Sequence, residues 1–224
     1  MITIPQIVEK IILKRPFLEE LLCSGLINLS SLARQIQPEI ETALRKDVKS
    51  GAIVMALKRI IPSLEKKGKH NEKFVLENLG DIIVRSNLLD MTFLNSDTLV
   101  EKQTELLDKI SNKKGVFYTF SQGVYETTLI LSSSVESEVI ELFKGENMLM
   151  RSSNLSSVTI KLAKDNNEMP GLYYFIFKRI AWEGINICEV ISTTHEFTIV
   201  VNDNDVNKVF SMLMELKKNN EKNM

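Results

Sequence analysis

Apolar residues recur every three or four positions through residues 1–79 of this 224-residue chain, which predicts a series of short amphipathic helices. Prolines break the pattern, and we expect Pro38 and Pro62 to interrupt or restart the helices in which they fall. The charged segment 65–72 contains Gly68 and is expected to be a loop or linker. The pattern therefore predicts a small helical bundle.

From about Asp81 the apolar spacing changes, and stretches of alternating residues separate the helical patterns. The predicted order is strand, helix, strand, strand, helix, with residues 147–151 able to supply a fourth strand. The segments that carry this pattern are 90–94, 99–110, 116–120, 127–131 and 135–143.

The same order of elements then repeats, over segments 158–162, 172–180, 185–191, 197–201 and 206–213. The two copies align at an offset near 70 residues, which places Glu126–Leu131 over Glu196–Val201. The second copy has no obvious fourth strand, because residues 217–224 are polar. We expect its open sheet edge to be covered by the other copy or by another subunit.

The second copy carries Met169-Pro170-Gly171-Leu172 before its first helix, Gly184-Ile185-Asn186-Ile187 after it, and Glu196 ahead of its last strand. With these motifs it resembles the ACT domain, and is most similar to the paired regulatory ACT domains of aspartokinases. The first copy is degenerate, with Asn95-Ser96-Asp97-Thr98 in place of the Pro-Gly motif. The resemblance implies an α+β fold in which a helical bundle precedes two ferredoxin-like βαββαβ ACT domains, with boundaries at 1–79, 80–152 and 153–224.

ACT domains sense small molecules, usually amino acids, so the resemblance implies an effector site where the first strand of the second copy runs into its first helix. Backbone N–H groups of Gly171 and Leu172 can bind a carboxylate at the start of that helix. The ammonium group needs an acceptor, and Asp165, Glu168 and Glu196 are candidates. The expected ligand-binding residues are Asp165, Met169, Pro170, Gly171, Leu172, Asn186, Ile187 and Glu196.

The formal net charge of -1 conceals an asymmetry, since residues 1–79 carry 13 Lys and Arg against 9 Asp and Glu. Basic residues gather between Arg45 and Lys73, and a local excess of this kind attracts phosphate. A head of helix-turn-helix type could therefore bind DNA through Arg45, Lys49, Lys58 and Arg59. The alternative is that these side chains form the solvated face of ordinary helices.

Other classes of function find little support in the composition. Cys23 and Cys188 are far apart and have no partner spacing, which favours a reducing cytoplasm and argues against a zinc site. No segment has the roughly 20 apolar residues of a membrane span. With two histidines, His70 in the charged segment and His195 at a hairpin, and no Gly-rich phosphate loop, we expect no catalysis, cofactor or metal.

We therefore expect a non-catalytic regulatory protein that binds a small effector, an amino acid, and forms a homodimer through its ACT sheets. Two alternatives stay open at this stage. The chain could be a ligand-responsive transcription regulator that binds DNA through the basic head, or its ACT folds could serve only in assembly.

Overall fold

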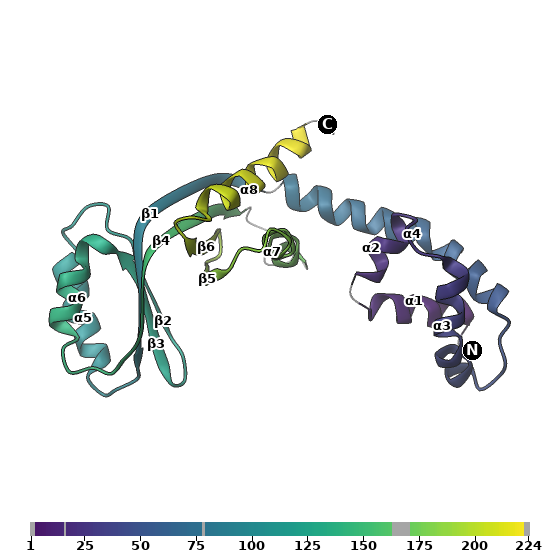
Figure 1. Cartoon of the computed structure of the whole chain (residues 1–224), viewed down its shortest axis with the longest axis horizontal. Helices are drawn as coiled ribbons and strands as arrows, with labels where there is room; N and C mark the ends of the chain where they lie inside the picture. The colour runs from purple at the N-terminus through teal and green to yellow at the C-terminus, as the bar shows by residue number, and fades with distance from the viewer. Residues whose placement is uncertain (1–2, 16, 78, 163–170, 222–224) are drawn as a thin grey trace. The chain divides into compact units, whose positions relative to one another are not determined.

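The fold is given by a computed structural model that describes residues 3–15, 17–77, 79–162 and 171–221. The chain divides into two units, Met1–Val75 and Leu76–Met224, which are described separately below. Figure 1 shows the order of the elements, with helices first and a mixed strand and helix region after them. The α+β fold class expected from the sequence is confirmed.

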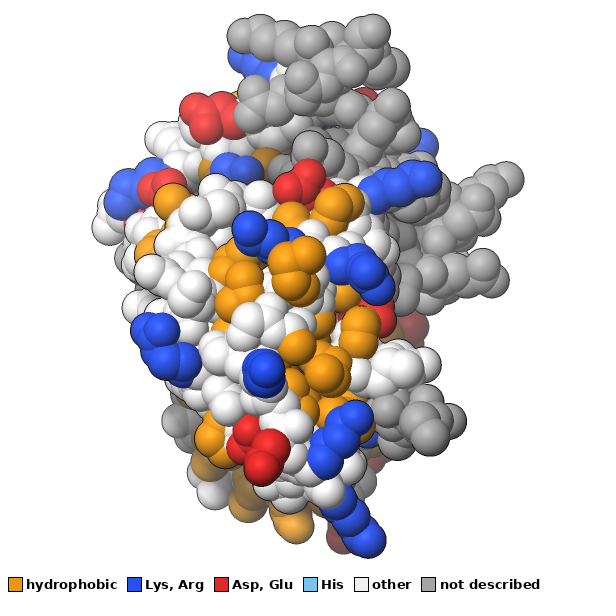
Figure 2. Space-filling model, turned by 90° about the vertical axis from the view of Figure 1, so that its right-hand side faces the viewer, with side chains coloured by type: hydrophobic (Ala, Val, Ile, Leu, Met, Phe, Trp, Pro, Cys, Tyr) orange, Lys and Arg blue, Asp and Glu red, His pale blue; other side chains and the backbone are white. Residues whose placement is uncertain are grey.

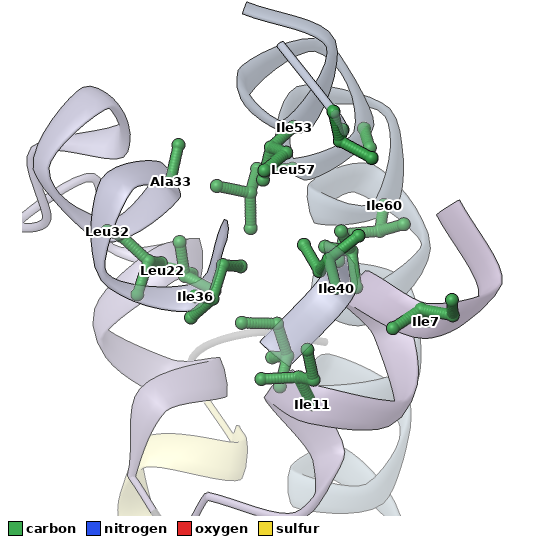
Figure 3. Packing of buried hydrophobic residues seen from close by; sticks show 14 of the residues in the cluster. Ile7, Ile11, Leu22, Leu32, Ala33, Ile36, Ile40, Ile53, Leu57 and Ile60 are labelled. Atoms are coloured by element: carbon green, nitrogen blue, oxygen red, sulfur yellow. The ribbon is translucent and has the colours of Figure 1, made fainter. Parts of the chain in front are cut away.

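The N-terminal unit is built from four helices, α1 (Ile4–Leu13), α2 (Leu18–Cys23), α3 (Leu29–Leu44) and α4 (Ser50–Glu77). Each helix contributes aliphatic side chains to one core, and Figure 3 shows Ile11, Ile36, Ile40 and Leu57 converging on its centre. Ile36, Ile40 and Leu57 are completely buried. Burial of this apolar stripe, rather than helix propensity alone, holds such short helices in place.

Two expectations for this unit were wrong. The segment 65–72 is not a loop, because α4 continues through it to Glu77. Lys and Glu are good helix formers, and one interior glycine costs only about 1 kcal/mol, too little to break a long helix. Pro38 and Pro62 lie inside the continuous helices α3 and α4. Each is exposed, so the backbone groups that proline leaves unpaired can be solvated.

The C-terminal unit contains one antiparallel sheet of six strands in the order β2-β3-β1-β4-β6-β5. Its strands are β1 (Leu79–Leu94), β2 (Tyr118–Gln122), β3 (Glu126–Ser132), β4 (Met148–Leu162), β5 (Ile187–Ser192) and β6 (Glu196–Asn202). The connecting helices are α5 (Leu99–Ile110), α6 (Glu136–Leu142), α7 (Leu172–Trp182) and α8 (Val206–Glu221), and the 3-10 turn Ser133–Val135 precedes α6.

The two long central strands, β1 and β4, are shared by both copies of the repeat. The first half of β4 pairs with the second half of β1, as Arg151 does with Met91, and provides the expected fourth strand of the first copy. The first half of β1 pairs in turn with the second half of β4, as Val84 does with Val158. The open edge of the second copy was expected to be covered by the other copy or by another subunit. It is covered by the other copy, because the first half of β1 supplies the fourth strand.

This exchange of half-strands has approximate twofold symmetry about the paired residues Leu88 and Leu155. The two copies are related by an offset of 67 residues. Val84 then corresponds to Arg151 and Val158 corresponds to Met91, so one paired position is converted into the other. Hydrogen bonds repeat as well. Thr92 Oγ1 and Thr128 Oγ1 lie 3.0 Å apart in the first copy, and Thr159 Oγ1 and Thr198 Oγ1 lie 2.8 Å apart at the matching place in the second. Two copies that keep the same partly buried hydroxyl pair support an internal duplication.

Both central strands bend near the symmetry axis, and Figure 1 shows α5, α6 and α8 on the outer side of the bend. On this side Leu89, Met91 and Phe93 of β1 form a core with residues of α5, β3 and α6. The opposite, inner side has its own small cluster of Leu88, Leu155, Ile130 and Val200, with Phe117 and Ile191 packed against it. The sheet is therefore buried on both faces near its centre.

Candidate effector site

The start of α7 carries the motif on which the effector site was predicted. Gly171 caps the helix with φ of 96° and ψ of -4°, a left-handed conformation that favours glycine. A Cβ at this position would meet no atom of the described residues within 4 Å, so the backbone conformation explains the glycine. Leu172 is buried beneath the first turn. Asp165, Glu168, Met169 and Pro170 lie outside the described residues.

The first turns of α7 are suited to a negatively charged ligand. No acidic residue occurs in the first turn, and the first charged residue of the helix is Lys178. The first N–H groups of a helix have no partner within the helix, and the helix dipole makes this end electropositive. A carboxylate bound there would face no repulsion from the first turns of α7.

Glu196 is positioned at this end of the second copy. It begins β6, is exposed, and pairs across the sheet with Lys161, one residue before the end of β4. In the turn before it, the backbone carbonyl of His195 accepts a hydrogen bond from the Leu162 N–H at 2.7 Å. His195 lies in the turn between β5 and β6, as its position at a hairpin predicted, and its neighbour Glu196 lies opposite the end of β4.

The structure places Asn186 and Ile187 at the other end of β5. Ile187 pairs with Val201, whereas Ser192 at the opposite end pairs with Phe197. Ser192 lies beside the start of α7, because its Oγ is 2.7 Å from the hydroxyl oxygen of Tyr173. The length of β5, about 17 Å at the usual rise per residue, separates the two ends. One small amino acid therefore cannot touch both the start of α7 and Asn186 of the same copy.

Two polar side chains beside the start of α7, those of Tyr173 and Ser192, were not predicted as site residues. Tyr173 is 39% exposed, and its ring lies 4.8 Å from that of Phe197 while its hydroxyl meets Ser192. The packed ring fixes the hydroxyl beside the helix start, where it can donate to a ligand. The signal in the sequence was a tyrosine in the first turn after Gly171, which is also common in helices that bind nothing.

The central part of the sheet contains a buried acidic group that sequence reasoning did not identify. Asp90 of β1 is 1% exposed, and its Oδ1 has no hydrogen-bond partner among the described residues. Desolvation, together with the charge of Glu189 on β5, raises the pKa of Asp90 to about 6. Burial and a neighbouring negative charge thus weaken the acidity of this carboxyl group.

Cys188 is an exposed residue of β5. The strand register slips between Ile187 and Glu189, so Cys188 occupies an irregular position that the alternation of the strand does not predict. Partial desolvation and then the charges of Asp90, Glu189 and Asp205 raise the pKa of its thiol. The thiol is therefore less readily ionised than that of an ordinary surface cysteine.

The four basic residues predicted to bind nucleic acid are all exposed in the N-terminal unit. Arg45 ends α3 with a left-handed φ of 51°, Lys49 immediately precedes α4, and Lys58 and Arg59 lie on α4. Figure 2 shows a face of the molecule on which Lys and Arg side chains surround a band of hydrophobic side chains.

The turn that joins α3 to α4 is fixed by three hydrogen bonds. The Glu41 carboxylate accepts from the Val48 N–H at 3.1 Å and from Gln37 Nε2 at 3.0 Å, and Gln37 also donates to the Val48 carbonyl at 3.0 Å. The hydrogen bonds from Gln37 and Val48 lower the pKa of Glu41. The turn carrying Arg45 and Lys49 is thus held in one conformation.

Within residues 3–15, 17–77, 79–162 and 171–221, no helix has the length and apolar character needed to cross a membrane. In the same ranges, no group of three or more His, Cys, Asp or Glu side chains is arranged to hold a metal ion.

The C-terminal unit has the arrangement of two paired ferredoxin-like βαββαβ domains. It is similar to the regulatory subunit of aspartate kinase from Thermus thermophilus in its ligand-free form, with a TM-score of 0.50 and 11% identity over 62% of this chain and 98% of that one. The corresponding subunit from Thermus flavus gives 0.50 and 8%, over 62% of this chain and 98% of that one.

The whole aspartate kinase of Clostridium acetobutylicum gives a TM-score of 0.51 and 15% identity over 62% of this chain and only 35% of that enzyme. The fold is therefore that of the regulatory, ACT-type domains of aspartokinases, and the likeness does not extend to most of the length of the kinase. No protein-family model matches the sequence, and no match was found among curated proteins.

Proposed function

We propose that this chain is a non-catalytic regulatory protein whose second ACT-type copy binds a small amino acid. The observation that carries the proposal is the start of α7, where Gly171 caps a helix with no charged residue before Lys178. The likeness to a regulatory subunit over 98% of its length supports the assignment. Residues 80–152 and 153–224 form the two copies, each completed by a half-strand of the other.

In the proposed complex, the effector carboxylate accepts hydrogen bonds from the N–H groups of Gly171 and Leu172. Its ammonium group is bound by Glu196, or by Asp165 in the segment that leads to the helix. Met169 and Pro170 shape the approach, since proline adds no N–H of its own. The Tyr173 hydroxyl, beside Ser192, provides a further donor.

In this proposal, Asn186 and Ile187 contact an effector that is bound at the α7 start of a second molecule of the chain. Because β5 separates them from the α7 start of their own copy, they reach an effector only if two copies meet in a homodimer. The outer edge of β5 is free for such an approach within the described sheet. A chain that stays monomeric at effector-saturating concentration would exclude Asn186 and Ile187 from the site, and light scattering measures this directly.

The connection between the units offers a route for regulation. Helix α4 ends at Glu77 and β1 begins at Leu79, so the strand that completes the second copy follows the last helix of the head after one residue. An effector that binds two arrangements of β1 with different affinity would shift the equilibrium between two arrangements of the N-terminal helical unit. The two cysteines, Cys23 and Cys188, are far apart in the sequence, which is compatible with work in the reducing cytoplasm, where we place the protein.

A thermal-shift screen of the twenty amino acids tests the proposal. One amino acid should raise the Tm of the wild-type chain in proportion to the logarithm of its concentration. Glu196→Gln should weaken that response about tenfold or more, because it removes a charge-assisted hydrogen bond. Glu126→Gln, at the matching position of the first copy, is the control and should leave the response unchanged. No shift with any amino acid at millimolar concentration would contradict the proposal.

A second candidate function is DNA binding by the basic head, favoured by the exposure of all four residues Arg45, Lys49, Lys58 and Arg59 on and beside a hydrogen-bonded turn. Duplex binding should weaken steeply with salt, and each Lys→Gln change should reduce the salt slope by about one. The absence of duplex binding at about 50 mM salt would remove this candidate. If neither effector nor DNA binds, the ACT folds serve only in assembly.

A further inference from the structure

The first copy differs from the second at the start of its first helix, where the carboxylate of Glu146 is already present. Glu146 lies between α6 and β4, and its side chain is only 4% exposed. Ser96 Oγ donates to Glu146 Oε2 at 2.6 Å, and Thr98 Oγ1 donates to Oε1 at 2.7 Å. Lys102 Nζ lies 2.8 Å from the same Oε1. Both carboxylate oxygens are therefore bound.

These partners come from the segment that replaces the Pro-Gly motif of the second copy. Ser96 and Thr98 directly precede α5, and Lys102 lies in its first turns. The Asn95 side chain holds the segment in place, since it donates to the Gly123 carbonyl at 3.0 Å and accepts from Thr127 Oγ1 at 2.7 Å. Lys102 Nζ also donates to the Lys144 carbonyl at 2.9 Å. The carboxylate-binding groups are thus fixed from both sides.

The chemistry of the contact is that of a bound anion. Hydrogen bonds from Lys102, Ser96 and Thr98 lower the pKa of Glu146 to about 2. Two hydroxyl donors and an ammonium group, aimed at a nearly buried carboxylate, stabilise its charged form. Other ion pairs of this unit are more open: the side chains of Arg151 and Glu136 are 42% and 26% exposed.

Among the described residues of the second copy, the positions that match Glu146 are not acidic. In the first copy the chain turns after α6 at Gly145, with φ of 91°, and returns Glu146 to the start of α5. Counted from the helix, at an offset of 70 residues, the second copy has Leu216, which lies inside the longer helix α8 and is 2% exposed. Counted from the exchanged half-strand, at the offset of 67 residues, the matching residue is Leu79, which is 5% exposed. Within residues 79–162 and 171–221, the residue that fills the first helix start therefore has no counterpart at the second.

We propose that Ser96, Thr98 and Lys102 form a carboxylate-binding site that the chain fills with its own Glu146, so that the first copy is occupied by an internal ligand and only the second accepts a free effector. The first part of this statement stands on the contacts alone, and the second rests on the function proposed above. A chain of this kind binds one effector per molecule although it has two copies of the fold.

Chemical rescue tests the site without any knowledge of the effector. Glu146→Ala removes the internal carboxylate and leaves Lys102, Ser96 and Thr98 without it. Sodium acetate should then raise the Tm of Glu146→Ala by about 2–4 °C more than the same concentration of sodium chloride. Wild type should show no such difference, and Glu146→Gln, which fills the space with a neutral group, should be destabilised without being rescued.

Two further variants define the specificity of the rescue. Glu136→Ala removes the more exposed ion pair with Arg151 and should show no acetate effect, and Glu146→Ala combined with Lys102→Ala should lose the effect. Equal stabilisation by acetate in every variant, or none in Glu146→Ala, would overturn the site. A Glu146→Ala chain that does not fold still leaves the wild type testable, because a Glu146 carboxyl that titrates near pH 4 in a carbon-13 NMR experiment would overturn it as well.

The stoichiometry of effector binding separates this inference from the proposed function. Calorimetry with the amino acid found by thermal shift should give one site per wild-type chain. Two sites per wild-type chain would overturn the self-filled first copy while leaving the function intact. If no amino acid binds, the proposed function fails, and the acetate experiment still decides whether the first copy holds an internal ligand.

Discussion

Asn87 and Asn154 have the same left-handed backbone conformation, with φ of 57° and 58°, and each lies one residue before a member of the Leu88 and Leu155 pair on the symmetry axis. The β1–β4 register is irregular at this point. A left-handed residue within a strand changes the direction of the chain, and asparagine adopts this conformation more readily than other non-glycine residues. The two asparagines therefore mark the positions where both central strands bend.

Replacement of either asparagine by alanine should destabilise the C-terminal unit. An alanine at positive φ costs about 1 kcal/mol, and glycine at the same position should cost little. We expect Asn87→Ala and Asn154→Ala to lower the free energy of unfolding by similar amounts in urea titrations. Ser86→Ala, at an exposed neighbouring position of β1, is the control, and an equal effect of all three alanine changes would contradict this account of the bend.

The paired hydroxyls of Thr92 and Thr128 should be energetically coupled. Thr92→Val alone removes one member of a hydrogen bond of 3.0 Å and should cost about 1 kcal/mol. Thr92→Val with Thr128→Val replaces both partners by side chains of the same shape, and should cost less than the sum of the single changes. A double-mutant cycle in denaturant measures the difference, and strictly additive costs would show that the pair does not contribute.

Asp90 should make the stability of the protein fall as the pH rises. Its pKa in the folded chain is about 6, above the ordinary value of 3.8, so folding favours the protonated form. The group is neutral in both states below about pH 4, and ionisation of the unfolded chain draws the equilibrium toward unfolding as the pH increases to 6. The full penalty above that pH is about 3 kcal/mol, from a shift of roughly two pKa units.

Asp90→Asn provides the measurement for this pH dependence. The variant carries no titrating group at position 90, so its free energy of unfolding should lack the fall between about pH 4 and pH 6 that the wild type shows. Glu189→Gln should reduce the fall, because the Glu189 charge is the second cause of the raised pKa. Superimposable profiles of wild type and Asp90→Asn would contradict the prediction.

The Glu41 carboxylate should stabilise the turn between α3 and α4. Glu41→Ala leaves the Val48 N–H and Gln37 Nε2 without their acceptor, and should lower the Tm more than Glu39→Ala, which removes only an exposed ion pair with Arg15. Because the pKa of Glu41 is lowered from 4.5 in the folded chain, its contribution is present above that value and is lost as the pH falls further. The difference between wild type and Glu41→Ala should therefore shrink at acid pH.

Local pattern was sufficient to predict most of the elements, because the spacing of apolar residues reports directly on helices and strands. It failed at Gly68 and Pro62 within α4, because the free-energy cost of one helix-breaking residue is smaller than the stability of the helix around it. It also placed only the second half of β1, at residues 90–94. The first half is largely exposed, and its alternation is weak, so its identity as a strand depends on the partner β4.

The candidate site was predictable in part for a similar reason. Gly171 has a local signature, because positive φ favours glycine. The binding of Glu146 by Ser96 and Thr98 joins segments about 50 residues apart, and the distance between Gly171 and Asn186 depends on the direction of β5. Relations of this kind arise from topology, which spacing along the chain does not contain.

The exchange of half-strands also sets the order in which the protein can form during synthesis. Residues 79–85 leave the ribosome long before residues 157–162, their partners in β4. Until then this strand edge is exposed and free to pair with another chain, so the interval is a window for misassembly. A chain truncated before residue 157 would keep that edge permanently open. Fusion or display of either copy by itself would therefore require that a separate peptide replace the missing half-strand.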